Sequence, residues 1–234
     1  MTQQPAASRN PWVFVPTLYF AEGLPYIIIN TVSVILYKKM GMDNASIAFW
    51  TSWLYLPWVV KMFWGPLVDI YSTKRKWILS TQLAMALCLF SASYALNTEG
   101  YFFFSLLAFA AGAFVSATHD IAADGFYMLA LSKESQALFV GIRATFYRLA
   151  MIFGSGLLVY TAGRIETLTG SIPLSWTAVI GAAGFVFVLV PLYHTFALPF
   201  PATDSKRSKR EATGDVPFLE IFRSYFKQEK IGAI

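Results

Sequence analysis

Six long apolar stretches, separated by short polar or charged turns, constrain this chain more than any other feature of its sequence. They run over 12–37, 47–68, 77–96, 101–129, 138–162 and 176–198. Each is close to the roughly 20 apolar residues that an α-helix needs to cross a bilayer core about 30 Å thick. The sequence therefore predicts an all-α, polytopic membrane protein with six transmembrane helices.

The composition supports this prediction and argues against a soluble protein. Hydrophobic residues make up 56% of the chain and charged residues 13%, whereas soluble globular domains contain roughly 45–50% and about 25%. The formal net charge is +5, but the cations lie mainly in turns between apolar runs. They therefore indicate membrane topology, and we expect the lipid bilayer, not nucleic acid, as partner. With the single cysteine Cys88, no intrachain disulfide can form.

The positions of Lys and Arg predict the orientation of the bundle. With the N-terminus inside, nine cations fall on inner segments: Arg9, Lys74, Arg75, Lys76, Lys133, Lys206, Arg207, Lys209 and Arg210. Only Lys38, Lys39 and Arg164 fall in the outer turns. Because cytoplasmic loops carry an excess of cations, we expect both termini in the cytoplasm.

The chain divides into four expected regions. A cytoplasmic tail covers 1–11, and the six-helix bundle covers 12–198. A polar, basic segment over 199–217 is typical of a cytoplasmic linker. Residues 218–234 place aromatic and aliphatic side chains at helical spacing among charges, which predicts an amphipathic helix on the membrane surface. This helix would lead toward a second half that the chain lacks.

The junction between the second and third apolar runs joins a helix end, an acid and a basic turn. It contains Gly65, then Asp69, then the cluster Lys74, Arg75 and Lys76. Cations at such a position face the anionic inner leaflet and hold the orientation of the segment. We expect these five residues to form a conformational latch and topology signal, not a contact with substrate.

Six charged residues lie within the predicted spans. They are Glu22, Lys61, Asp120, Asp124, Arg143 and Arg148. A charge at the centre of a spanning helix costs roughly 2.5 to 3.5 kcal/mol on insertion scales. These side chains should therefore face one another or water inside the bundle. Small residues precede the two aspartates at intervals of four, which places them on a helix face suited to close packing.

Together these motifs resemble the AmpG-type muropeptide permeases of the major facilitator superfamily, with acetyl-coenzyme A transporters as a more distant likeness. The segments that carry the resemblance are Glu22-Gly23-Leu24-Pro25, Lys61 with Pro66-Leu67-Val68-Asp69, His119-Asp120 with Asp124, and Tyr147-Arg148-Leu149. The resemblance covers about residues 12–198. It implies the N-terminal half of a twelve-helix, proton-driven importer in the bacterial inner membrane, which requires a second six-helix half. The usual cargo is a cell-wall fragment of amino sugars with a short acidic peptide.

On this interpretation, we expect the anionic substrate to be bound by Arg148, assisted by Lys61 or Arg143. The residues expected to couple transport to protons are Glu22, Asp120 and Asp124. The residues alone leave open which carboxylate carries the proton. No catalytic residue, cofactor or metal is expected.

Three other interpretations remain open. The chain could carry another organic anion such as an acyl-coenzyme A, or be a non-transporting fragment of a carrier. It could also be a membrane-embedded enzyme with a metal bound by His119, Asp120 and Asp124. Adjacent side chains on a helix diverge by about 100°, and the sequence has no second ligand cluster, which makes the enzyme the weaker hypothesis. The two histidines, His119 and His194, are expected to be hydrogen-bonded structural residues.

Overall fold

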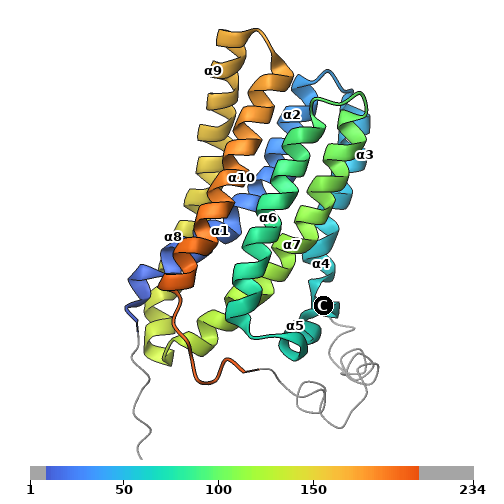
Figure 1. Ribbon diagram of the computed structural model, residues 1–234. Helices are drawn as coiled ribbons and strands as arrows, with labels where there is room; N and C mark the ends of the chain where they lie inside the picture. The colour runs from blue at the N-terminus through green and yellow to red at the C-terminus, as the bar shows by residue number, and fades with distance from the viewer. Residues whose placement is uncertain (1–8, 206–234) are drawn as a thin grey trace, which may run out of the picture.

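The computed structural model describes residues 9–205, which form a bundle of helices lying side by side (Figure 1). This part of the chain contains no strand, so the predicted all-α fold is confirmed. Within it, five helical runs are long and apolar enough to cross a membrane: Pro11–Lys39, Lys74–Ala95, Tyr101–Ala130, Lys133–Thr169 and Ile172–Ala197.

Three of these runs are single helices, and two are composite. The single helices are α6 (Lys74–Ala95), α7 (Tyr101–Ala130) and α10 (Ile172–Ala197). The first run comprises η1 (Pro11–Val13), α1 (Val15–Ile27), the π-helix η2 (Ile28–Val32) and α2 (Ser33–Lys39). The fourth, Lys133–Thr169, comprises α8 (Lys133–Ile152), the π-helix η5 (Phe153–Leu158) and α9 (Val159–Thr169).

The second expected span, over 47–68, is where the structure departs from a simple transmembrane helix. It is divided into α3 (Asn44–Ser52), η3 (Trp53–Tyr55), α4 (Leu56–Val60), η4 (Lys61–Phe63) and α5 (Gly65–Tyr71). Pro57 and Pro66 stand in the first turns of α4 and α5. Proline lacks a backbone N–H and clashes with the preceding turn, so it favours a break at these points. The break places Lys61 on a short 3-10 turn between two helices.

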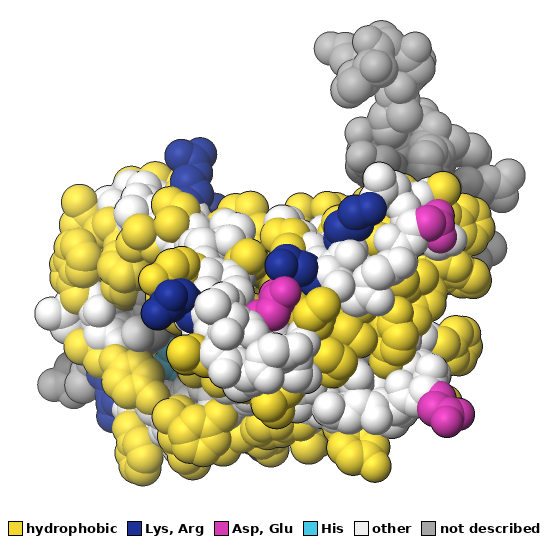
Figure 2. Space-filling model, turned by 90° about the horizontal axis from the view of Figure 1, so that it is seen from above, with side chains coloured by type: hydrophobic (Ala, Val, Ile, Leu, Met, Phe, Trp, Pro, Cys, Tyr) yellow, Lys and Arg dark blue, Asp and Glu magenta, His cyan; other side chains and the backbone are white. Residues whose placement is uncertain are grey.

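The sides of the bundle carry large apolar side chains, and charges gather at its ends. Exposed residues on the sides include Leu87, Phe103, Tyr160, Phe185 and Phe196. Figure 2 shows one end of the bundle, where hydrophobic side chains cover much of the outline and charged groups stand both near the middle and at the edge. A soluble protein rarely exposes so much contiguous apolar surface, whereas a membrane-spanning bundle needs it.

The interior is divided into two hydrophobic clusters, and the charged residues lie where they meet. One cluster includes Leu24, Ile28 and Ala113. The other includes Leu18 and Ala122, nearer the end of the bundle where α6 begins. The boundary between the clusters falls between Tyr19 and Ala21 on α1, just before Glu22, and between Ala113 and Ala122 on α7, the stretch that contains Asp120.

The helices α1 and α8 pack closely where they cross, because glycines lie at the crossing. A Cβ atom on Gly23 would lie 2.7 Å from the carbonyl oxygen of Tyr147 and 3.1 Å from Cβ of Ala150. Gly154 of η5 meets the side chain of Ile27 in the same way. The two π-helices also contact each other. At this crossing, α8 packs against the part of α1 that carries Glu22.

A buried chain of hydrogen bonds ties four helices together. The Gln82 side chain lies 3.0 Å from Nε2 of His119 and 3.0 Å from Nδ1 of His194. Nε2 of His194 in turn lies 3.0 Å from the Thr17 hydroxyl. The chain links α1, α6, α7 and α10, and both histidines are hydrogen-bonded, as expected from the sequence.

Parts of the expected domain organisation lie outside the described residues. These are positions 1–8 of the tail, the linker beyond Ser205, and the amphipathic helix expected over 218–234.

We predict that Gly23→Ala destabilises the bundle by about 1–3 kcal/mol, because the new methyl group has no room against the Tyr147 carbonyl. Thermal unfolding in detergent, followed by circular dichroism, measures the change. Gly163→Ala is the matched control, since nothing lies within 4 Å of a Cβ at that helical position. Equal melting temperatures for the two variants would contradict the close crossing.

Candidate functional site

The break in the second span places a lysine next to an acidic residue of α7. Lys61 on η4 forms an ion pair with Asp120 on α7. The side chain of Asp120 is mostly enclosed, and that of Lys61 is about one-third exposed. A charge pair at this depth avoids the cost of presenting either ion to lipid. Two of the residues expected to face inward therefore meet each other.

Glu22 on α1 lies beside this pair and adds a second carboxyl group. It is 8% exposed, and its carboxyl group lies near that of Asp120. Its Oε2 atom has no hydrogen-bond partner among the described residues. Ionised carboxylates only accept hydrogen bonds, so a bond between two carboxyl groups requires a proton on one of them. Two acids facing one ammonium group can therefore hold and release a proton.

A second cluster joins Asp124, Arg143 and Tyr19. Nη1 of Arg143 donates to Oδ1 of Asp124 at 2.9 Å and to the Tyr19 hydroxyl oxygen at 3.0 Å. The Tyr19 hydroxyl donates to the same carboxylate oxygen at 2.9 Å. The guanidinium carbon also lies 5.0 Å from the ring centroid of Tyr127. Arg143 of α8 is thus engaged by an acid and two aromatic rings from two other helices, α1 and α7.

The expected latch residues lie at the end of the bundle where α6 begins. Lys74 forms an ion pair with Asp69, and its methylene groups pack where a Cβ on Gly125 of α7 would stand. Gly65 is the first residue of α5, and a Cβ atom added to it would have nothing within 4 Å. The side chain of Lys76 is exposed. The ion pair joins the ends of α5 and α6, on either side of the turn at 72–73.

The segment after α10 folds back onto this latch through Asp204. Its two carboxylate oxygens accept hydrogen bonds from the backbone N–H groups of Lys74, at 2.7 Å, and Arg75, at 3.0 Å. The Arg75 guanidinium donates to the Thr195 carbonyl oxygen at 2.6 Å and lies 3.8 Å from the ring centroid of Phe200. A carboxylate at a helix N-terminus satisfies donors that lack partners within the helix.

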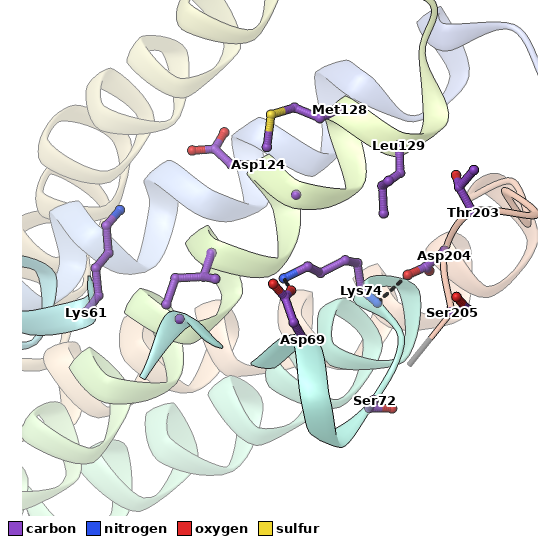
Figure 3. Close-up of a pocket in the computed structure, with 13 residues that line it drawn as sticks. Lys61, Asp69, Ser72, Lys74, Asp124, Met128, Leu129, Thr203, Asp204 and Ser205 are labelled. Atoms are coloured by element: carbon purple, nitrogen blue, oxygen red, sulfur yellow. Dashed lines mark hydrogen bonds and ion pairs between the residues drawn. The ribbon is translucent and has the colours of Figure 1, made fainter. Parts of the chain in front are cut away.

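A cavity of about 590 Å³ lies between α5, the end of α7 and this returning segment (Figure 3). Charged side chains of both signs line it: Lys61, Asp69, Lys74, Asp124 and Asp204. Figure 3 shows Lys74 directed toward Asp69. The volume lies within the roughly 300–1,000 Å³ typical of small-molecule sites. The two charged clusters are thus reached from one end of the bundle.

Arg148 is placed differently from the other arginine of its span. It is exposed on α8 and forms no ion pair with any described residue. The structure therefore separates the two arginines that the sequence proposed for substrate binding. Arg143 is held by Asp124, whereas the guanidinium group of Arg148 has no ion-pair partner within residues 9–205.

The three side chains that would form a metal site engage three different partners. His119 faces Gln82, Asp120 pairs with Lys61, and Asp124 pairs with Arg143. Within residues 9–205, no group of three or more His, Cys, Asp or Glu side chains is arranged to hold a metal ion. The three side chains thus contact residues of three different segments, α6, η4 and α8.

Two members of these clusters were not anticipated from the sequence. Tyr19 lies three residues before Glu22, on the same face of α1, and that spacing was an available signal. Asp204 sits in a polar segment far from Lys74 in the chain, and no local pattern marks it as a helix cap.

Comparison with known proteins gives a consistent assignment. The family model described as Major Facilitator Superfamily matches residues 17–233. The chain is 27% identical over 152 residues to the anhydromuropeptide permease of Escherichia coli K12, covering 63% of this chain and 30% of that protein. It is 26% identical over 228 residues to an uncharacterized protein of Haemophilus influenzae, covering 87% and 51%. The chain thus spans about half, or less, of the length of these relatives.

We predict that Asp204→Ala destabilises the protein by about 1–2 kcal/mol, because two N–H groups at the start of α6 lose their acceptor. Asp204→Asn keeps an acceptor oxygen and should lose about half as much. Thermal unfolding in detergent tests both variants. Thr203→Ala is the control at the neighbouring position, and an Asp204→Ala protein as stable as this control would show that the cap contributes nothing.

Proposed function

This chain belongs to the Major Facilitator Superfamily, and we propose that it forms the N-terminal half of a proton-coupled carrier. The cargo is a muropeptide or a related anionic amino-sugar compound, imported across the bacterial inner membrane with both chain termini in the cytoplasm. A second six-helix half completes the central cavity, as the fold requires. The coverage of the permease of Escherichia coli, at 30% of its length, is consistent with half a carrier.

The observation that carries this proposal is the cluster of Glu22, Asp120 and Lys61. Two carboxyl groups share one ammonium group, so the cluster is balanced in charge only when one acid holds a proton. A bare extra charge at this depth would be costly, which favours proton uptake whenever the cluster is closed to water. The cluster therefore has the composition of a proton-coupling site.

The same arrangement links the proton to an anionic cargo in the direction of symport. When a proton occupies Asp120, the attraction that holds Lys61 weakens, and the ammonium group can bind a carboxylate of the cargo. When the proton leaves, Asp120 competes with the cargo for Lys61. Proton binding and cargo binding thus favour each other, as thermodynamic linkage requires. Asp124 with Arg143 forms a second exchangeable pair nearer the end of the bundle.

Arg148 supplies a further contact for the cargo. Its guanidinium group can grip a carboxylate through two parallel hydrogen bonds, and it has no competing acid among the described residues. Gly65, Asp69, Lys74, Arg75 and Lys76 act as the latch that closes this end of the carrier. Breaking the ion pair between Asp69 and Lys74 lets α5 separate from α6 when the halves rock.

We predict that Glu22→Gln abolishes accumulation driven by a pH gradient while exchange of cargo across the membrane continues. Glutamine imitates the protonated acid and cannot release the proton, so the coupling is lost but the cargo contacts remain. Uptake of labelled anhydromuropeptide into proteoliposomes, by the chain joined to its second half, measures both processes. Glu166→Gln is the control, since Glu166 pairs with Lys39 on the far end of the bundle. Gradient-driven accumulation unchanged by Glu22→Gln would reject the coupling role.

We predict that Arg148→Ala weakens binding of a carboxylate-bearing muropeptide about 100-fold, and Arg148→Lys about tenfold, because lysine keeps the charge but loses the fork. A muropeptide whose carboxylates are amidated should lose much less in both variants. Binding is measured by calorimetry on the reconstituted carrier, with Arg164→Ala as the control for loss of an exposed arginine. Equal losses for charged and amidated cargo would leave Arg148 without a role in recognition.

A further inference from the structure

The π-helix η2 holds a buried asparagine whose hydrogen bonding is incomplete. Asn30 is 4% exposed, and its Nδ2 atom donates to the Tyr26 carbonyl oxygen at 3.1 Å. Its Oδ1 atom has no partner among the described residues. An unpaired buried carbonyl oxygen lowers the stability of the folded protein, so folding alone does not explain an asparagine at position 30. π-Helices inside α-helical runs occur frequently at functional sites.

Asn30 lines a cavity that is separate from the charged site. This cavity, of about 420 Å³, lies between the first helical run and α3, at the end of the bundle opposite the latch. Polar groups share its wall with apolar ones: Asn44, Thr51, Ser52 and Tyr55 lie among Val34, Ile47 and Ala48. Lys38 stands at its edge. The cavity is large enough for a sugar ring and has the mixed lining of a small-molecule site.

The cavity is aligned with the proton-coupling cluster along one side of the first run. Glu22, Tyr26 and Asn30 recur at intervals of four, which places them along one side of the first run. Asn30 lies roughly 12 Å from Glu22 along the axis, at 1.5 Å per residue. A molecule that spans this interval can touch both sites at once.

Aromatic rings occupy the interval between the two sites. The Tyr26 ring lies 6.4 Å from the ring of Tyr55 and 5.1 Å from that of Trp58, with edges meeting faces. Tyr147 of α8 lies 6.3 Å from Tyr26 on the other side. Such rings offer apolar faces and hydroxyl groups together, a combination suited to a ring that is apolar on its faces and polar at its edge.

We propose that this cavity is a second cargo subsite, which takes the uncharged, hydroxyl- and acetamido-bearing sugar of the cargo. Asn30 accepts a hydrogen bond from an N–H or O–H group of that sugar. The inference rests on the proposed function and adds to it the part of the cargo recognised here. A carboxylate brings no proton, so it cannot satisfy Oδ1.

The test separates the two ends of the cargo. The chain joined to its second half, in lipid nanodiscs, is titrated by calorimetry with two probes. One is the neutral disaccharide of N-acetylglucosamine, and the other is the acidic peptide of the muropeptide without sugar. Asn30→Ala should weaken disaccharide binding about tenfold, the effect of one lost hydrogen bond, and leave peptide binding unchanged. Asn97→Ala, in which the lost side chain bonds Thr177 outside the cavity, should change neither.

A melting curve separates a ligand group from a structural one. If Asn30 is held for cargo, Asn30→Leu keeps or raises the melting temperature of the empty protein, because an unpaired buried carbonyl is removed. If a buried water completes its bonding, Asn30→Leu lowers the melting temperature as much as any lost internal bond, and the inference fails.

The outcomes also distinguish this inference from the function on which it rests. Peptide binding without disaccharide binding in the wild type, or equal loss of both in Asn30→Ala, overturns the subsite and leaves the anion carrier standing. Disaccharide binding that depends on Asn30, without any peptide binding, supports the subsite and rejects the anionic cargo. Binding of neither probe overturns both.

Discussion

The ion pair between Lys61 and Asp120 is the interaction on which the arrangement of this half-bundle depends. It joins a helix that is broken by Pro57 and Pro66 to one that runs unbroken for 30 residues. A continuous second helix would satisfy its own backbone hydrogen bonds around Lys61, whereas a helix broken within a membrane needs partners from the protein or from water at the break. The pair fixes that irregular segment against α7, and the segment in turn gives the lysine freedom to exchange partners.

Close contact between α1 and α8 completes the same site from the other side. Gly23 allows the Tyr147 backbone to approach next to Glu22, so the acid is enclosed by protein instead of lipid. The two hydrophobic clusters pack the helices together on either side of Glu22 along the bundle axis. The hydrogen bonds of Gln82 join α6 to α7 and α10. Strong packing on both sides of a thin polar layer allows a few charges to change partners without disturbing the rest.

Much of this architecture could be predicted from the sequence, because span length and the depth of charges are properties of single segments. The helix α7 (Tyr101–Ala130) coincides with the apolar run over 101–129, and the inward direction of Lys61 and Asp120 followed from the cost of charge in lipid. Which cation pairs with which acid could not be predicted, since it depends on the rotation of helices distant in sequence. The break in the second span was signalled by Pro57 and Pro66, but an average over an apolar window hides such residues. Asp204 gave no local signal.

The capping of α6 by Asp204 makes the exit of the chain from the bundle a mechanical anchor. A pull on the backbone at Ser205 meets two hydrogen bonds to the first turn of α6, the stack of Arg75 on Phe200, and the adjacent pair of Lys74 with Asp69. A force applied there therefore acts first on the contacts that hold the N-terminal end of α6, and not on α10. A force on the chain after Ser205 therefore acts directly on the turn between the second and third spans, without any contact with the cargo.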